Sequence, residues 1–239
     1  MNPTPQPPIV SSDEWLRARR ELLEREKAFT RARDELTAAR QALPWVRVEQ
    51  PYLFTTPRGP RSLAQLFGSR QQLIVYHFMF APDWAAGCKS CSFWADSFDG
   101  VVTHLAQRDV AFVAVSRAPL AQLQAYAQRM GWTFDWASSQ GCSFNVDFGV
   151  SFTPEALASG AATYNFGTQR ATLAELPGFS VFARDPKGTV YRTYSCYARG
   201  LDPFNVAYQL LDLVPKGRDE AGLAFPMAWV RRHDEYGQG

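Results

Sequence analysis

The sequence lacks an uninterrupted apolar run of the ~20 residues that a membrane-spanning helix requires. Its longest such run, residues 73–80, has the length of a strand and contains His77. The first ten residues are rich in proline and polar residues and lack the basic and apolar regions of a secretory signal. We therefore expect a soluble, cytoplasmic protein that makes no membrane contact.

An excess of charge of either sign is also missing. Lysine and arginine number 25 and the acidic residues 23, which gives a net charge of +2. The two signs alternate along the chain, so the sequence does not imply nucleic acid or an anionic membrane as a partner. Hydrophobic residues make up 46% of the 239 positions, which is enough for one large domain with terminal extensions.

Cysteine is scarce, with four residues. In a reducing compartment so few cysteines do not predict a static disulfide framework. Cys88 and Cys91 stand in a C-x-x-C spacing, which indicates redox chemistry or metal binding. Cys142 and Cys196 are isolated in sequence and are expected to be small buried residues, unless folding brings one of them to Cys88 as a second resolving thiol.

Three parts follow from the pattern along the chain. Residues 1–44 form an N-terminal arm whose helix, residues 15–42, has a narrow apolar stripe and a charged opposite face. This helix is expected to pack on the domain or on a partner subunit, which would make the protein a homo-oligomer. Residues 45–214 form the main α/β domain, and residues 215–239 an extension laid over its core through Phe225, Met227 and Trp229.

The main domain is expected to contain a βαβ unit. Residues 73–80 read as a strand covered on both faces, residues 92–107 as a helix, and residues 109–115 as a second buried strand parallel to the first. Three further elements follow: a helix over residues 120–130, an antiparallel hairpin of residues 179–182 and 189–193, and a closing helix over residues 205–213. Residues 132–152 are aromatic and show no clear period.

The C-x-x-C pair is expected at the start of the helix that follows the first buried strand. Unpaired N–H groups at a helix N-terminus stabilise a thiolate, and Lys89 adds a nearby cation. Cys88 is therefore predicted to be the nucleophile, with the lower pKa and the greater exposure. Cys91, one turn later and more buried, is placed to resolve a mixed disulfide formed at Cys88.

Five segments carry a more specific pattern: residues 76–80, 87–96, 115–119, 197–200 and 229–236. Together they resemble the bacterial thioredoxin-like family called domain of unknown function 899, over nearly the whole chain. The resemblance implies a thioredoxin-like α/β fold, with a central mixed sheet flanked by helices, and an activity of the kind labelled dithiol-disulfide isomerase or peroxiredoxin-like. It also implies that Pro177 is the cis-proline that faces the dithiol in thioredoxin-like proteins, whereas the sequence alone favours an ordinary trans-proline at the start of a strand.

Two departures from better-known relatives bear on the reaction. Thioredoxins have Trp directly before the first cysteine, where this chain has Gly87, and Trp84 is the nearest preceding tryptophan. Peroxiredoxins have Thr or Ser three residues before their reactive cysteine, a position held here by alanine. Peroxide reduction would therefore need another hydrogen-bond donor, for which Arg117 and Arg199 are the candidates.

Three hypotheses remain open. The first is a thiol-disulfide oxidoreductase that needs no cofactor and acts on a disulfide or thiol of a small molecule or a protein. The second is a copper or other soft-metal protein in which Cys88 and Cys91 bind the metal and His77 is an optional further ligand, with Met79 expected on the same strand face as His77. The third is a non-catalytic module that binds a small molecule or a partner.

The remaining candidates have ordinary interpretations. His104 and His233 are expected at the surface, with His233 in a charged and solvated tail. A group of aromatic side chains is expected mainly to fill the core, with a pocket for a planar ligand as the alternative. These aromatic residues are Trp84, Phe93, Trp94, Trp132, Phe134 and Trp136.

Overall fold

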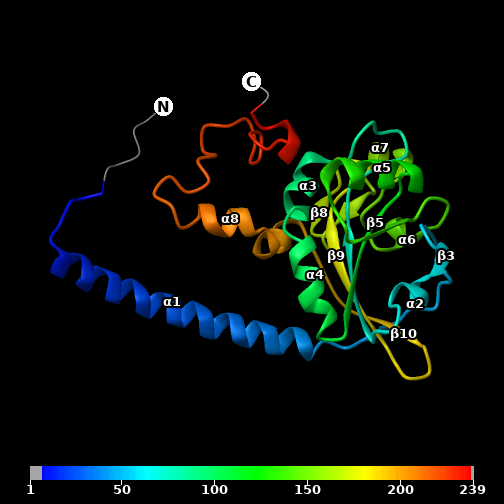
Figure 1. Ribbon diagram of the computed structural model, residues 1–239, viewed down its shortest axis with the longest axis horizontal. Helices are drawn as coiled ribbons and strands as arrows, with labels where there is room; N and C mark the ends of the chain where they lie inside the picture. The colour runs from blue at the N-terminus through cyan, green and yellow to red at the C-terminus, as the bar shows by residue number, and fades with distance from the viewer. Residues whose placement is uncertain (1–6, 238–239) are drawn as a thin grey trace. The chain divides into compact units, whose positions relative to one another are not determined.

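The computed structural model describes residues 7–237 of the chain (Figure 1). The chain forms two compact units, Met1–Pro44 and Trp45–Gly239. Within the described residues, no helix combines the length and the apolar character needed to cross a membrane.

The first unit is a helix, α1 (Ser12–Gln41), which begins three residues before the predicted start. A capping box causes this start: the Ser11 side chain accepts a hydrogen bond from the Glu14 backbone, and the Glu14 carboxylate accepts one from the Ser11 backbone. None of the residues of α1 is buried. The helix therefore presents its whole apolar stripe at its surface.

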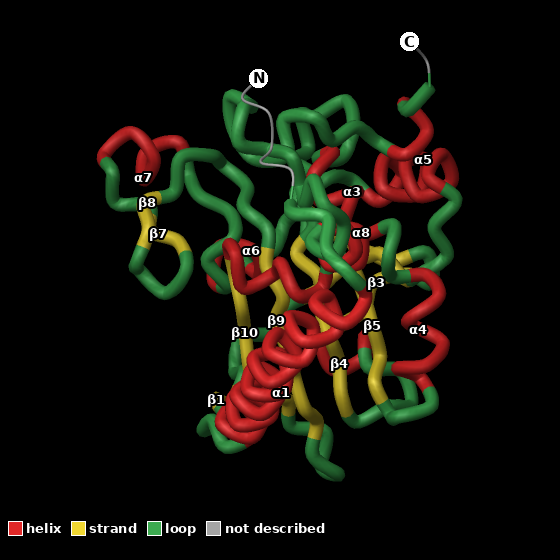
Figure 2. Tube along the Cα trace, turned by 90° about the vertical axis from the view of Figure 1, so that its left-hand side faces the viewer, coloured by secondary structure: helices red, strands yellow, loops and turns green. Residues whose placement is uncertain are grey.

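The second unit is built on a mixed eight-stranded sheet with the strand order β1-β10-β9-β4-β5-β6-β2-β3. Its strands are β1 (Val46–Arg47), β2 (Leu53–Thr56), β3 (Gly59–Ser62), β4 (Gln72–His77), β5 (Val110–Ser116), β6 (Asp135–Ser138), β9 (Gly178–Arg184) and β10 (Val190–Tyr197). A separate two-stranded sheet pairs β7 (Thr163–Tyr164) with β8 (Gln169–Arg170). Figure 2 shows β10, β9, β4 and β5 side by side.

The centre of the sheet has the predicted arrangement. The apolar strand β4 pairs in parallel with β5 and antiparallel with β9, and β9 and β10 form the predicted hairpin. The helices are α2 (Leu63–Leu66), α3 (Lys89–Ala95), α4 (Asp99–Ala106), α5 (Leu120–Met130), α6 (Phe144–Asp147), α7 (Pro154–Ser159) and α8 (Val206–Leu211), with 3-10 helices η1 (Ala198–Phe204) and η2 (His233–Glu235). β4 and β5, with α3 and α4 between them, form the predicted βαβ unit. This unit, followed by α5, the β9–β10 hairpin and α8, confirms the expected thioredoxin-like fold.

The prediction of one helix over residues 92–107 is wrong, since α3 and α4 are separate (Figure 1). Phe98 turns into the core between them and is buried. Asp99 then starts α4, and its carboxylate accepts hydrogen bonds from the backbone of Thr133 and Phe134. The turn between α3 and α4 is therefore hydrogen-bonded to the residues that lead into β6. Those residues belong to the segment 132–152, for which the sequence showed no clear period.

The sheet separates two hydrophobic cores. Alternate residues of β4 contribute to each, with Tyr76 in one core and Val75 in the other. The first core also contains most of the predicted aromatic group, in contacts such as the edge-to-face pair of Phe78 and Trp136, so the expected core packing is confirmed. Met227 and Trp229 pack against this core, whereas Phe225 is exposed and does not have the core contact expected of it.

Candidate functional site

The two cysteines of the C-x-x-C pair lie where β4 passes through a loop into α3. Cys88 is the N-cap residue of α3, and its backbone N–H donates a hydrogen bond to the Met79 carbonyl at 3.1 Å. Cys88 is half-buried, whereas Cys91 is only 2% exposed, and both are free thiols. The expected difference in exposure between the two sulfurs is confirmed.

The two thiols also differ in acidity. A hydrogen bond from the Cys91 thiol, followed by backbone N–H groups of Cys91 and Ser90, lowers the pKa of Cys88 to about 6, although burial acts in the opposite direction. Burial raises the pKa of Cys91. At neutral pH the pair is therefore a thiolate at Cys88 beside a protonated thiol at Cys91, which is the division of roles that thiol exchange requires.

Gly87 leaves no room for a side chain before the first cysteine. A Cβ at this position would lie 2.7 Å from the Phe78 ring and 2.8 Å from the Tyr126 ring. Both rings belong to the buried core, so neither can move without repacking. The tryptophan that thioredoxins have at this position cannot be accommodated here.

A cation reaches the site from the C-terminal part of the chain. The Arg232 guanidinium donates hydrogen bonds to the Gly87 carbonyl at 2.7 Å, to the Tyr126 hydroxyl at 2.9 Å and to the Glu235 carboxylate at 2.9 Å. Its charge contributes to the lowered pKa of Cys88. The sequence singled out Lys89 as the nearby cation; Lys89 is the first residue of α3 and half-buried, and its role stays a prediction.

Hydrogen bonds also fix the backbone of both cysteines. The Ser92 hydroxyl donates to the Cys88 carbonyl at 2.9 Å and lies 2.9 Å from the Tyr126 hydroxyl. The buried Tyr76 hydroxyl donates to the Cys91 carbonyl at 3.2 Å. Ser92, Tyr126 and Arg232 were not among the predicted site residues. The available signal was their presence in, or contact with, the segments 87–96 and 229–236 that carry the family resemblance.

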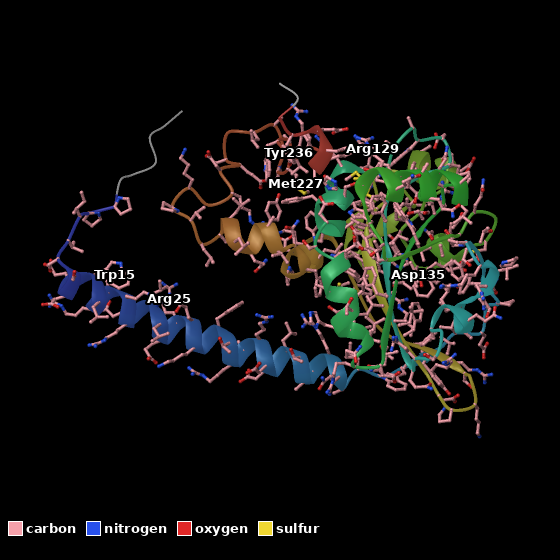
Figure 3. All side chains as sticks on the ribbon, in the orientation of Figure 1. Trp15, Arg25, Arg129, Asp135, Met227 and Tyr236 are labelled. Atoms are coloured by element: carbon pink, nitrogen blue, oxygen red, sulfur yellow. The ribbon has the colours of Figure 1, made fainter. Side chains whose placement is uncertain are left out.

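The C-terminal segment, defined here as residues 229–236, makes further contacts with the helices around the dithiol. Arg129, labelled in Figure 3 beside this segment, donates hydrogen bonds to Asp234 and Glu235. The Nδ1 atom of His233 lies 2.7 Å from an Asp96 carboxylate oxygen that also accepts a hydrogen bond from Trp132. His233 is exposed, as predicted, and its partner Asp96, the C-cap residue of α3, holds it against the site. His104 is exposed, as predicted.

His77 lies on the opposite face of the sheet from Cys91. It is 1% exposed, stacks on Phe144 and Phe148, and its Nε2 atom lies 2.8 Å from the Ser180 hydroxyl. Burial, with a smaller contribution from Arg192, lowers its pKa to about 3.

The proposal that His77 supplements Cys88 and Cys91 as a metal ligand is therefore wrong. Successive side chains of β4 point to opposite faces, and Tyr76, not His77, points toward Cys91. The strand ends at His77, so Met79 falls outside the alternation and lies in the core with Tyr76. Among the described residues, no group of three His, Cys, Asp or Glu side chains could hold a metal ion.

The expected cis peptide bond at Pro177 is also absent, because the bond that precedes this residue is trans. The trans form is the intrinsically favoured one for X-Pro bonds. Pro177 directly precedes β9, whose first residue, Gly178, pairs with His77. Its carbonyl accepts a hydrogen bond from the Tyr164 hydroxyl. The role of Pro177 toward the dithiol stays a prediction.

The two arginines proposed as peroxide donors have other partners. Arg117 donates from Nε to the Glu175 carboxylate at 2.6 Å. The Arg199 side chain is 88% exposed and pairs with Asp202. Neither donates a hydrogen bond to Cys88 in the described part of the chain. Trp84 is partly buried against the core that contains Cys91.

The other two cysteines lie in different cores. Cys196 is buried in β10 and belongs to the same core as Cys91, whereas Cys142 packs against the core on the other face of the sheet. Cys142 is therefore separated from the dithiol by the sheet.

Solved structures similar to this chain include peroxidoxin BcpB from Mycobacterium tuberculosis, 15% identical, with 70% of this chain and 97% of that chain covered and a TM-score of 0.45. A mutant of peroxiredoxin Q from Xanthomonas campestris is 12% identical over 70% of this chain and 98% of that chain, with a TM-score of 0.43. A secreted disulfide oxidoreductase from M. tuberculosis, homologous to E. coli DsbE, is 16% identical over 66% and 96%, with a TM-score of 0.38.

Among curated proteins, none matches the sequence. A family model does match, over residues 4–236, and its description is a bacterial protein of unknown function, DUF899. The match includes the dithiol and the whole C-terminal segment, so the resemblance seen in five short motifs extends over almost the full length. This chain belongs to the bacterial DUF899 family.

Proposed function

We propose that the protein is a thiol-disulfide oxidoreductase in which Cys88 is the nucleophile and Cys91 the resolving thiol. The observation that carries the proposal is the inequality of the two sulfurs. Cys88 is half-buried with a pKa of about 6, and Cys91 is 2% exposed with a raised pKa and donates a hydrogen bond to Cys88. The substrate is a disulfide, or in the reverse direction a dithiol, of a small molecule or a protein.

In the reducing direction, the Cys88 thiolate attacks one sulfur of the substrate disulfide. A Cys88–substrate disulfide forms, and the other substrate sulfur leaves as a thiolate. Cys91 then gives up its proton to the departing sulfur and attacks Cys88, which releases the second substrate sulfur as a thiolate that takes its proton from water. The substrate gains two electrons and two protons, and the protein is left with a Cys88–Cys91 disulfide that an external dithiol reduces again.

The geometry fits this order of events. The Ser92 and Tyr76 hydroxyls hold the carbonyls of the two cysteines, so the first turn of α3 is fixed while the sulfurs exchange partners. Cys91, held under Cys88 in the core, resolves the intermediate without a movement of the helix. We also propose that this chemistry needs no metal or organic cofactor.

Reduction of oxidised glutathione and of hydroxyethyl disulfide, each with excess dithiothreitol, tests the proposal. We expect turnover in the wild type and in Cys142→Ser, whose thiol packs against the other core, and none in Cys88→Ser. Incubated with oxidised glutathione in the absence of dithiothreitol, Cys91→Ser should accumulate a mixed disulfide with glutathione, visible as an added mass of one glutathione. The proposal is wrong if Cys88 and Cys91 form no reversible disulfide or if Cys88→Ser retains turnover.

A second assay separates the soft-metal alternative from the redox reaction. The reduced protein is titrated anaerobically with Cu(I) in the presence of a competing chelator. Stoichiometric binding that disappears in the Cys88→Ser variant, together with no disulfide turnover, would favour a two-thiolate copper protein. We expect turnover without stoichiometric copper.

For the protein's partner we propose a second copy of the chain, paired through α1. Four large apolar residues recur at seven-residue intervals on this helix: Trp15, Leu22, Phe29 and Leu36, each at least 46% exposed. A seven-residue repeat is the spacing of a coiled-coil seam. Between Ser12 and Gln41 the sequence has eight basic and seven acidic residues, so each helix has a net charge of only +1 and two copies repel each other little.

A further inference from the structure

Arg232 joins a distant part of the chain to the residue directly before the nucleophile. Its Nη2 atom donates to the Gly87 carbonyl across a separation of 145 residues. Its Nε atom donates to the Tyr126 hydroxyl, and its Nη1 atom to the Glu235 carboxylate. All three nitrogens of the guanidinium are therefore engaged, and the side chain is only 20% exposed.

The surroundings hold this guanidinium in one place. Glu235, one turn later, bonds both Arg232 and Arg129, and Arg129 also bonds Asp234. The planar fork of an arginine can serve several acceptors in one fixed orientation, which the single ammonium of lysine cannot do. Arg232 is thus oriented before any substrate arrives.

The contacts of Arg232 reach the nucleophile by two routes. The direct route is the Gly87 carbonyl, which belongs to the peptide unit whose N–H is that of Cys88. The indirect route runs through the Tyr126 hydroxyl to Ser92, whose hydroxyl donates to the Cys88 carbonyl. The backbone on both sides of Cys88 is held, and the positive charge of Arg232 acts on the Cys88 thiol.

We propose that Arg232 is a positioning residue for the dithiol, which fixes the loop before Cys88 and supplies the positive charge that favours its thiolate. The inference rests on the proposed function, since it assigns to the C-terminal segment a part in the reactivity of the same sulfur. Removal of the guanidinium leaves the Gly87 carbonyl without its charged donor and Cys88 without its cation.

The groups that face Cys88 set the direction of the expected change. Cys91 and the N–H groups of α3 lower the pKa of Cys88, and Arg232 adds to them, whereas Glu235 carries the opposite charge beside Arg232. Tyr76 and Tyr126 have raised pKa values, so both stay neutral over the range in which Cys88 titrates. Without Arg232 the Cys88 pKa therefore rises.

The test is the pH dependence of Cys88 alkylation by iodoacetamide, followed by mass spectrometry of the Cys88 peptide. We expect the midpoint in Arg232→Ala to rise by about one pH unit, which lowers the rate at pH 6 roughly fivefold. Arg232→Lys should fall between the two, because it keeps a charge and loses the fork. Arg231→Ala is the matched control. Arg231 is the exposed neighbour of Arg232, and within the described residues only its backbone N–H forms a hydrogen bond, to the Tyr236 hydroxyl.

An unchanged midpoint in an Arg232→Ala protein that melts cooperatively would overturn the inference. If that variant does not fold, Arg232→Lys decides in its place, and a wild-type midpoint in Arg232→Lys would overturn the role of the fork. The alkylation readout does not depend on turnover. A wild type that never forms the Cys88–Cys91 disulfide would thus disprove the proposed function, while the midpoint would still decide the role of Arg232.

Discussion

The Nε atom of Arg117, the residue that directly follows β5, donates a hydrogen bond to the buried Glu175 carboxylate at 2.6 Å. The other Glu175 oxygen accepts a hydrogen bond from Ser151 at 2.6 Å, and the Glu175 side chain is 2% exposed. A carboxylate so deeply buried is tolerated only with partners of this kind. The role of Arg117 is therefore to stabilise the fold as a partner of this buried carboxylate.

We expect Arg117→Ala to lower the free energy of unfolding by about 2 kcal/mol, less than the roughly 3–5 kcal/mol of a fully buried pair, because the Arg117 side chain is 33% exposed. Urea denaturation at pH 7 measures the loss. Arg58→Ala is the control, since the Arg58–Asp135 pair is exposed on both sides and should contribute less than about 1 kcal/mol. Equal losses in the two variants would contradict the assignment.

Glu175 also gives the stability of the protein a pH dependence. Burial raises its pKa above the ordinary value of 4.5, despite the opposing effects of Ser151 and Arg117. The native state therefore holds this proton to a higher pH than the unfolded state, so its contribution is present below pH 4.5 and is lost as pH rises above that value. We expect the stability of Glu175→Gln relative to wild type to increase from pH 4.5 to pH 7, as measured by urea denaturation. A constant difference would be inconsistent with a raised pKa.

His77 should give the stability of the protein a pH dependence of the opposite sign. Its pKa falls from 6.5 to about 3 in the native state, so the unfolded state takes up the proton first as pH decreases. Stability from this group is complete above pH 6.5 and is lost as pH falls toward 3. We expect the melting temperature of the wild type to fall more between pH 7 and pH 5 than that of His77→Gln. Parallel curves for the two proteins would show that His77 does not titrate in this way.

A methyl group at Gly87 tests the packing in front of the dithiol. Gly87→Ala places a Cβ within 2.8 Å of two core rings and should cost ~1–3 kcal/mol of stability. Gly100→Ala adds the same methyl group in α4 with no atom within 4 Å, and should be neutral or stabilise by up to about 1 kcal/mol. Thermal unfolding should show a lowered melting temperature for Gly87→Ala and no lowering for Gly100→Ala, and a neutral Gly87→Ala would mean that the two rings can move aside.

The pairing of α1 predicts a change in mass. Phe29→Glu places a charge within the seven-residue row and should convert a dimer into a monomer, as seen by light scattering over a dilution series. Gln41→Glu adds the same charge about 140° around the helix from Leu36 and should leave the mass unchanged. A wild-type monomer at all concentrations would exclude a second copy and leave the chain's own second unit, or another protein, as the occupant.

The sequence was most informative where neighbours along the chain decide the structure. The apolar run before Cys88 predicted β4, and the C-x-x-C after it predicted a reactive thiol at the start of a helix. His77 was misjudged because the run of apolar residues continues to Phe80, whereas β4 ends at His77. A continuous apolar strand also does not show which of its residues face which core.

Arg232 could not be assigned for a different reason. It lies in a charged stretch that has no period and no motif with a known chemistry, and its partner Gly87 is 145 residues earlier. The steric effect of the Phe78 and Tyr126 rings on Gly87 was equally hidden, because three segments must fold together before a side chain there has anything to collide with. Contacts of this kind become visible only in the folded chain.

The separation between Gly87 and Arg232 has a consequence for how the protein is made. At about 5–20 residues per second, a ribosome that has added Gly87 needs roughly 7–30 s to reach Arg232. The thiols of Cys88 and Cys91 are thus synthesised well before the guanidinium that contacts their loop. During that interval both cysteines of the nascent chain lack the guanidinium that contacts their loop in the folded protein, so the Cys88 thiol acquires its folded surroundings only after residue 232 has been added.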